Sequence, residues 1–397
     1  MFRSLPTFPS TQYLLAWLDE VVLTPERLRH AEEIIARLSS TSPEVAKLAH
    51  APQSAPHHTE GPYISSHVER MLASVVALES MASLAEVEEI VREKNFHLEF
   101  QAVEATVREQ ANFLSAYAVL HDLAKAEAVC IEAPLGSPGH AAGFSQTIQG
   151  STPAEQERFS KLFRSFAASH QGLAPWQLQI EFFNAYQLRI HYPHHGRLAA
   201  TEKYAQARSS VMHFFNVSSS HARLMSELIR LHMDVIRSFT TAADTARYQM
   251  IVALPDRLGL NKELFLELIP ATLFIDAVVG SLQSNGQVIF CDLSLLLNYF
   301  KAEREVAPQR HEARVQAALR GRKQAVKETL VEANLDAEVV FALLNTPHGP
   351  VRGKVMEDVY ELIKNPDATV DFGPHTPEIK KRANMAKNLL AERNLHL

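Results

Sequence analysis

Cysteine is scarce in this sequence, which has only Cys130 and Cys291 among its 397 residues. Two cysteines so far apart make neither a zinc knuckle nor a disulfide framework, which is typical of a protein in a reducing compartment. The chain does have 19 histidines and 45 acidic side chains. Any metal site must therefore use imidazole and carboxylate ligands.

Long apolar runs are lacking as well. The longest, such as residues 273–279 around Asp276, are far shorter than the roughly 20 residues that cross a bilayer. Prolines and polar residues interrupt the opening segment MFRSLPTFPS, which therefore lacks the apolar core of a signal peptide. These absences predict a cytoplasmic protein without a membrane partner.

The chain has no excess of basic residues, since 39 lysines and arginines stand against 45 acidic residues and the formal net charge is −6. This balance excludes nucleic-acid binding through overall charge. One local basic stretch remains, and it is interpreted either as a solvated helix face or as a phosphate-binding surface. Its residues are Arg310, Arg314, Arg320, Arg322 and Lys323.

Glycine occupies only 14 positions, and strand-like alternation of apolar and polar residues is nearly absent. Apolar residues instead recur three and four positions apart, as they do on one face of a helix. The sequence therefore predicts an all-α fold. The expected helices cover residues 13–23, 28–38, 68–84, 87–107, 113–129, 224–239 and 264–282.

Composition divides the chain into three blocks. Residues 1–58 form an N-terminal helical segment that closes at the Pro/His-rich linker APQSAPHHTEGP. Residues 59–300 contain the most apolar helices and most of the histidines, so we expect them to form the core domain. Residues 301–397 form a C-terminal region of charged helices.

The sharpest local feature is the doublet His121-Asp122 in AYAVLHDLAKAEAV, within an expected apolar helix. Neighbouring residues of a helix point about 100° apart, so two buried polar groups there need a shared partner between them. A divalent cation is such a partner. The alternative is a structural histidine at a helix end beside a solvent-facing aspartate.

Two further residues extend this candidate metal site. His67 lies on the opening turn of the helix predicted from SSHVERMLASVVAL, and Asp276 lies among apolar residues in ELIPATLFIDAVVGSL. A carboxylate in such surroundings is costly to bury unless it is paired or bound to a metal. Asp244 in TTAADTARY is the rival for the last ligand, although it also fits a helix N-cap. A mixed set of histidines and carboxylates suits Mg, Mn, Fe, Ni, Co or Zn.

The ordered set His67, His121-Asp122 and Asp276 resembles the H…HD…D signature of the HD superfamily of metal-dependent phosphohydrolases, and LHDLAK resembles its HDxxK form. The segment YPHHGRLAATEKYAQARSSVMHFFNVSSSHARLMSELIRLHMD is similar to the HD domain of bacterial tRNA nucleotidyltransferases. The tail LLNTPHGPVRGKVMEDVYELI resembles the helical region that follows that domain. The glycine-serine and paired-acid signature of their nucleotidyltransferase domain is absent from the sequence.

The resemblance implies an HD-domain helical bundle with N-terminal and C-terminal helical extensions, and a divalent metal held by His67, His121, Asp122 and Asp276. It implies a phosphohydrolase or phosphodiesterase acting on a nucleotide or an RNA-terminal phosphate, including a 2′,3′-cyclic phosphate. Asp122 would orient the attacking water. The residues that would neutralise the phosphate are His195, His232, Lys125 and Arg197, with His140 and His170 as alternative histidines in similar contexts.

Two other functions stay open at this point. If His195 and His232 are also ligands, four histidines and two aspartates would form a binuclear site like those of HD-type diiron oxygenases and some cyclic-dinucleotide phosphodiesterases. A non-catalytic HD scaffold would instead bind RNA or a protein through the basic C-terminal helices. The sequence also leaves open the identity of the metal and a homo-oligomeric state.

Overall fold

The computed structural model describes residues 23–55, 57–80, 85–145, 150–284, 289–393 and 395. Apart from Leu23, the helix expected over residues 13–23 lies outside the described residues. Helices dominate the described chain, and its strands form only two short antiparallel pairs, which confirms the all-α prediction. None of the helices in the described ranges is both long enough and apolar enough to span a membrane.

The chain divides into two compact units, Met1–His311 and Glu312–Leu397. Residues 23–58, part of the expected N-terminal block, contribute Leu38 and Leu48 to the main core of the first unit. The boundary expected after residue 300 lies inside helix α17 (Ser294–Val306), and the division between the units lies inside helix α18 (Pro308–Glu332).

The main body of the first unit is built from helices that pack around one apolar core. In chain order, its elements besides α17 are α2 (Pro25–Thr41), α3 (Pro43–Ala46), η2 (Lys47–Ala49), α4 (Ile64–Glu79), α5 (Ala85–Glu93), α6 (His97–Glu109), α7 (Ala111–Leu120), α8 (Lys125–Ala128), α12 (His195–Ala199), η3 (Glu202–Tyr204), α13 (Ala205–Phe214), η4 (Ser219–His221), α14 (Ala222–Phe239), α15 (Thr245–Leu258), α16 (Lys262–Leu273), η5 (Phe274–Gly280), β3 (Gln283–Ser284) and β4 (Ile289–Phe290).

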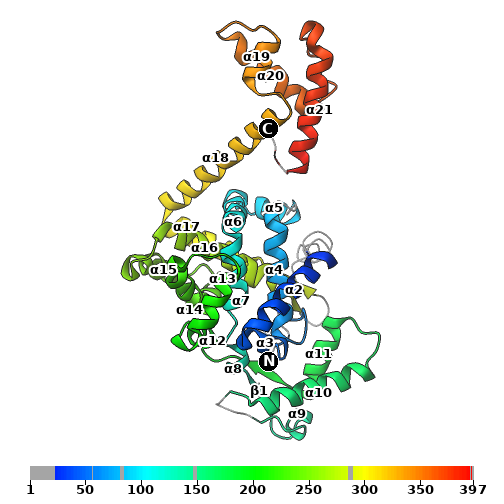
Figure 1. Ribbon diagram of the computed structural model, residues 1–397, viewed down its shortest axis with the longest axis vertical. Helices are drawn as coiled ribbons and strands as arrows, with labels where there is room; N and C mark the ends of the chain where they lie inside the picture. Colours follow the sequence, from blue (N-terminus) through cyan, green and yellow to red (C-terminus); the bar gives the residue numbers. More distant parts are fainter. Residues whose placement is uncertain are drawn as a thin grey trace. The chain divides into compact units, whose positions relative to one another are not determined.

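The helices α4, α7 and α14 and the π-helix η5 meet at the centre of the unit. Helix α4 packs against α2, α7 and η5, and α14 packs against α12 and α16. Figure 1 shows α7 between the blue helices α2 and α4 on one side and the green helices α12 and α14 on the other. Polar residues on the inward faces of α4, α7, α14 and η5 are therefore brought together, although these elements are far apart in the sequence.

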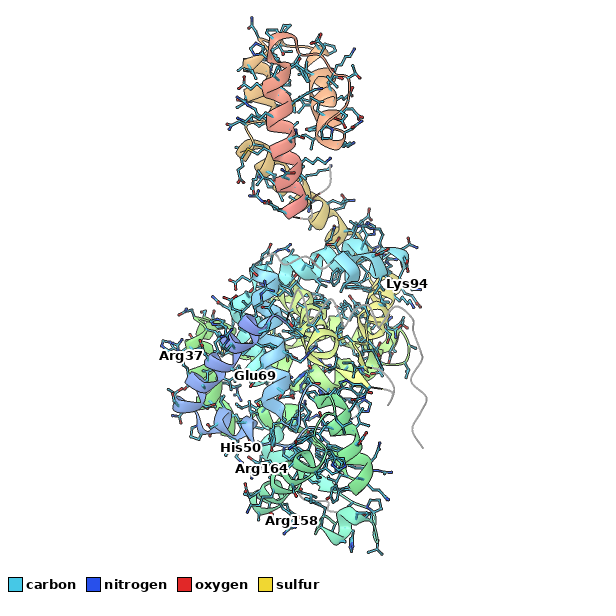
Figure 2. All side chains as sticks on the ribbon, turned by 90° about the vertical axis from the view of Figure 1, so that its right-hand side faces the viewer. Arg37, His50, Glu69, Lys94, Arg158 and Arg164 are labelled. Atoms are coloured by element: carbon cyan, nitrogen blue, oxygen red, sulfur yellow. The ribbon has the colours of Figure 1, made fainter. Side chains whose placement is uncertain are left out.

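A separate aromatic cluster occupies the segment between the His-Asp doublet and His194-His195. This segment contains the helices α9 (Pro138–Ala141), α10 (Pro153–Ser169) and α11 (Pro175–Tyr186). Its strand β1 (Cys130–Glu132) pairs antiparallel with β2 (Arg189–His191). Phe159, Phe163 and Phe182 pack edge-to-face or stacked in its core. In Figure 2, Arg158 and Arg164 on α10 lie at the opposite end of the unit from Lys94.

The second unit has its own small apolar core around Leu335, Val359 and Ile379. It consists of the remainder of α18 followed by α19 (Ala337–Leu343), α20 (Val351–Lys364), η6 (Gly373–His375) and α21 (Thr376–Glu392). Helices α20 and α21 pack against each other.

The structure breaks three of the helices that periodicity predicted as continuous. The helix expected over 87–107 is interrupted after α5, where Asn95 adopts a left-handed conformation with φ 61°, a common way to end a helix. The helix expected over 113–129 ends at Leu120, and residues 121–124 form a turn before α8. The helix expected over 264–282 changes at Phe274 from α to π geometry.

Candidate metal centre

The His-Asp doublet lies at the end of a helix rather than inside one. His121 is the residue that follows α7, and its Nδ1 donates to the carbonyl of Ala118 at 3.0 Å. The turn continues with backbone bonds from Leu123 to Leu120 and from Lys125 to Asp122. Both doublet side chains are almost fully buried, so the alternative of a solvent-facing aspartate is wrong.

His67 and Asp276 face this doublet from α4 and η5. His67 lies on the first turn of α4, as expected, and its Nε2 is 3.2 Å from Asp276 Oδ1 and 4.0 Å from Asp122 Oδ2. His121 Nε2 is 3.3 Å from Asp122 Oδ2 and 3.6 Å from Asp276 Oδ1. The rival aspartate, Asp244, is instead the N-cap of α15, where it accepts a hydrogen bond from the Arg247 amide.

Two more histidines approach the other oxygen of Asp122. His195 is the first residue of α12 and His232 lies in the buried face of α14. Their Nε2 atoms are 2.9 Å apart and lie 3.3 Å and 3.9 Å from Asp122 Oδ1, respectively. The structure therefore places both histidines beside the predicted metal ligands.

All four histidines are held in the same way, because each Nδ1 faces a main-chain carbonyl at hydrogen-bond distance. The acceptors are Gly280 for His67 at 2.9 Å, Ala118 for His121 at 3.0 Å, Tyr192 for His195 at 2.9 Å and Ile229 for His232 at 2.6 Å. A carbonyl can only accept, so this network assigns the proton to Nδ1 of each ring. In the neutral form of each ring the lone pair is then on Nε2, which is the arrangement that metal-binding histidines require.

These four Nε2 atoms and the carboxylates of Asp122 and Asp276 converge on one buried space, and we call the six residues the central cluster. Two imidazole lone pairs facing each other, or facing a carboxylate, repel unless a proton or a cation lies between them. His121 Nε2 and both oxygens of Asp122 make no hydrogen bond of acceptable geometry with any described residue, although the Lys125 ammonium group forms an ion pair with Asp122 Oδ2 at 2.6 Å. Buried acceptors in this condition fit bound cations.

Asp122 divides the central cluster into two possible coordination groups. Its Oδ2 faces His67 and His121, and its Oδ1 faces His195 and His232. Ligand atoms of His67, His121 and Asp122 lie within 4.8 Å of one another, as do those of Asp122, His195 and His232. A carboxylate shared in this way is suited to bridge two metal ions.

Two glycines allow the helices to approach each other closely at the ligands. A Cβ on Gly196 would lie 2.6 Å from His232 Cε1 and 2.7 Å from the carbonyl oxygen of Ile229. A Cβ on Gly280 would lie 2.6 Å from Met71 Cγ and 3.0 Å from His67 Cε1. Any larger residue at either position would therefore push a predicted ligand out of place.

Charges around the central cluster shift the pKa values of its members. Burial opposes the charged form of His67, but hydrogen bonds to Asp276 and Glu60 outweigh it and raise its pKa to about 10. Burial and the neighbouring His195 lower the pKa of His232 to about 3. Burial would raise the pKa of Asp122, yet His121 and Lys125 hold it well below its usual range.

Sequence reasoning missed two residues that support His67. The Glu60 side chain is buried, and its Oε1 lies 3.3 Å from His67 Nδ1 and 2.9 Å from His58 Nδ1. Its Oε2 accepts a hydrogen bond from the Leu282 amide at 3.1 Å. His58, Glu60 and His67 form a third group with metal-binding distances. The proline-rich composition of residues 51–62 is typical of a linker, so it does not indicate that His58 and Glu60 support His67.

The remaining predicted residues lie at different distances from the central cluster. Lys125 is buried, with Nζ 2.6 Å from Asp122 Oδ2, and it also lies over the Tyr192 ring. The exposed Arg197 is not in the cluster but lines an opening that also includes His195. His140 and His170 belong to α9 and to the end of α10, in the segment of the aromatic cluster, so neither joins the four histidines.

No protein-family model, curated protein or solved structure matches this chain.

Proposed function

We propose that this chain is a metal-dependent phosphohydrolase or phosphodiesterase of the HD type, acting on a nucleotide or an RNA-terminal phosphate. The observation that carries the proposal is the convergence of four imidazole Nε2 atoms and two buried carboxylates, each histidine with its Nδ1 at hydrogen-bond distance from a main-chain carbonyl. These residues are also the ones that carry the sequence resemblance to the HD superfamily. A divalent ion in this donor set would lower the pKa of a coordinated water and polarise a phosphoryl oxygen.

Protein groups around the central cluster have separate roles in this proposal. His195 lines an opening together with Arg197, and in this proposal the phosphate approaches the cluster from that side. Arg197 attracts the phosphate at the opening, and Lys125 supplies a buried positive charge 2.6 Å from Asp122. Asp122 accepts a proton from, or orients, the water that attacks phosphorus.

The shared position of Asp122 favours two metal ions over one. A pair of ions bridged by a carboxylate can stabilise both the attacking and the leaving oxygen of an in-line displacement. The same donor set of four histidines and two aspartates suits a diiron oxygenase, which is the second candidate function. Two irons per chain together with oxygen uptake would support the oxygenase. Two ions of Mn, Ni, Co or Zn with hydrolysis of a phosphoester bond would support the hydrolase.

Asp122→Asn tests the proposal, because the amide keeps the shape of the side chain and loses its charge. We expect the variant to lose most bound metal and to lose at least about 100-fold in hydrolysis of bis-p-nitrophenyl phosphate and 2′,3′-cyclic AMP. Asp256→Asn is the matched control, since Asp256 is largely exposed and pairs with Lys262 outside the cluster.

Circular dichroism and the thermal midpoint establish that both variants fold. A folded Asp122→Asn protein with wild-type hydrolysis would refute the assignment. Wild-type protein that binds RNA but hydrolyses nothing across a panel of Mg, Mn, Ni, Co, Fe and Zn would favour the non-catalytic scaffold instead.

A further inference from the structure

The opening beside His195 carries more positive charge than contact with a single phosphate requires. Its lining includes three arginines, Arg197, Arg230 and Arg237, against one acidic residue, Asp234. His195 belongs both to this lining and to the central cluster. The arginines therefore line the same opening as one member of the central cluster.

The arrangement of these residues follows from two helices. Arg230, Asp234 and Arg237 are four and three residues apart on α14, so they share one face of that helix. Arg197 comes from the short helix α12, which approaches α14 closely because Gly196 has no side chain. The opening is thus lined by residues of two helices that lie close together.

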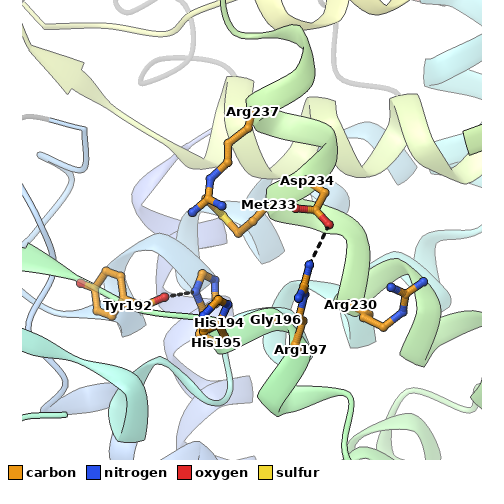
Figure 3. A pocket seen from close by; sticks show the side chains of 9 residues that line it. All are labelled: Tyr192, His194, His195, Gly196, Arg197, Arg230, Met233, Asp234 and Arg237. Carbon is orange, nitrogen blue, oxygen red and sulfur yellow. Dashed lines mark hydrogen bonds and ion pairs between the residues drawn. The ribbon is translucent and has the colours of Figure 1, made fainter. Parts of the chain in front are cut away.

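The three arginines differ in whether they already form an ion pair with an acidic side chain. Arg230 is paired with Glu227 at 2.6 Å, and Arg197 lies 3.7 Å from Asp234. Arg237 is exposed and has no ion-pair partner within 4.0 Å in the part of the chain that the structure describes. Figure 3 shows Arg237 extending from α14 toward the side where His194 and His195 lie, whereas Arg230 points away from them.

We propose that Arg237, together with Arg197, binds a second phosphate group that is linked directly or through one nucleoside to the phosphate at the central cluster. The preferred substrate class is then a molecule with two linked phosphates, not a simple phosphomonoester. A guanidinium group suits this role because its fork of N–H donors pairs with two phosphate oxygens at once. Asp234 holds Arg197 toward the opening. This inference rests on the proposed function only in placing the first phosphate at the central cluster.

A binding experiment tests the second phosphate site without requiring turnover. Isothermal titration compares pyrophosphate with orthophosphate on metal-loaded wild-type protein and on Arg237→Ala, Arg237→Lys and Arg223→Ala. We expect wild type to bind pyrophosphate at least about 10-fold tighter than orthophosphate. Arg237→Ala reduces this preference to about 3-fold or less, and lysine restores only part of it because an ammonium group lacks the fork.

Arg223 provides the matched control, because it is an exposed arginine on α14 that does not line the opening. Arg223→Ala should keep the full preference for pyrophosphate. Pyrophosphate could also remove metal from the protein, but that loss would be equal in all variants. A preference that falls in Arg237→Ala and not in Arg223→Ala therefore reports binding by Arg237.

Activity measurements identify the source of the second phosphate. Bis-p-nitrophenyl phosphate has one phosphate, so its KM should change less than about 2-fold in Arg237→Ala. If Arg237→Ala increases the KM for ADP about 10-fold or more, the preferred substrate is a nucleoside polyphosphate. If it increases the KM for a 5′-phosphorylated dinucleotide by the same factor, the preferred substrate is a nucleotide chain.

Failure of the inference and failure of the proposed function give different results. Equal binding of the two anions, or a preference that Arg237→Ala leaves intact, overturns the second phosphate site even when bis-p-nitrophenyl phosphate is hydrolysed. An arginine-dependent preference for pyrophosphate in a protein that hydrolyses no phosphoester supports the site and overturns only the hydrolase.

Discussion

Metal binding to this chain should release about one proton from His67 and should become tighter as pH rises. In the metal-free protein the pKa of His67 is about 10, because Asp276 and Glu60 outweigh the effect of burial. The ring is therefore protonated at neutral pH, with Nδ1 donating to Gly280 and Nε2 to Asp276. A metal ion at Nε2 must displace that proton.

The size of the effect follows from the difference between this pKa and the experimental pH. Between pH 7 and 8.5 the ion competes with a proton that is bound almost fully, so the dissociation constant should fall about 10-fold per pH unit, or about 30-fold in total. The metal-free protein should lose stability over the same range. A histidine whose pKa is raised on folding stabilises fully below its unfolded value of 6.5, and this contribution is lost as pH rises toward 10. The expected loss is about 2 kcal/mol between pH 7 and 8.5.

Isothermal titration of metal-free protein with Mn²⁺ measures both quantities. Titrations in buffers of different ionisation enthalpy give the number of protons released, and urea unfolding gives the pH dependence of stability. His213→Gln is the control, since His213 is exposed on α13 and outside the cluster. A dissociation constant that changes less than about 2-fold between pH 7 and 8.5, with no proton released, would refute the reasoning.

Three other residues give further tests. Glu60→Gln removes the carboxylate beside His67 Nδ1 and should weaken metal binding about 10-fold, measured by competition with a chelator. Glu44→Gln, on the first turn of α3 and outside the cluster, should not. Gly196→Ala forces a Cβ against His232 and should cost about 1–3 kcal/mol in urea unfolding, with a lower metal content by plasma emission. Burial and then Glu88 raise the pKa of Glu104 to about 8, so stability should fall as pH rises from about 4.5 to 8. Glu104→Gln should flatten that urea profile, and an unchanged slope would contradict the assignment.

The all-α fold was predictable because apolar spacing reports directly which face of a helix is buried. The helices expected over 28–38 and 224–239 correspond to α2 and α14. Periodicity could not locate the breaks, because a residue such as Asn95 interrupts a helix by its own backbone conformation without changing the apolar pattern on either side. The predicted helix over 87–107 therefore became α5 and α6.

The candidate ligands were predictable for a different reason, namely that a buried polar residue is costly and stands out in an apolar run. This criterion selected His121, Asp122 and Asp276, and the structure brings all three together with His67. It could not select Glu60, which lies in a polar, proline-rich segment where an acidic residue is ordinary. Its burial depends on contacts with α4 and the chain after η5, which are distant in sequence.

Several of the ligands lie where a helix ends or changes geometry. His121 follows the last residue of α7 and still has helical backbone angles, φ −61° and ψ −34°, and Asp122 follows it in the turn. Both side chains face the same space. Asp276 lies in a π-helical turn, a distortion that is frequent at functional sites. His195 begins a helix directly after His194, whose φ is 55°. Four of the six ligands thus lie at or beside irregular backbone, and those are the positions where a regular pattern predicts the structure least well.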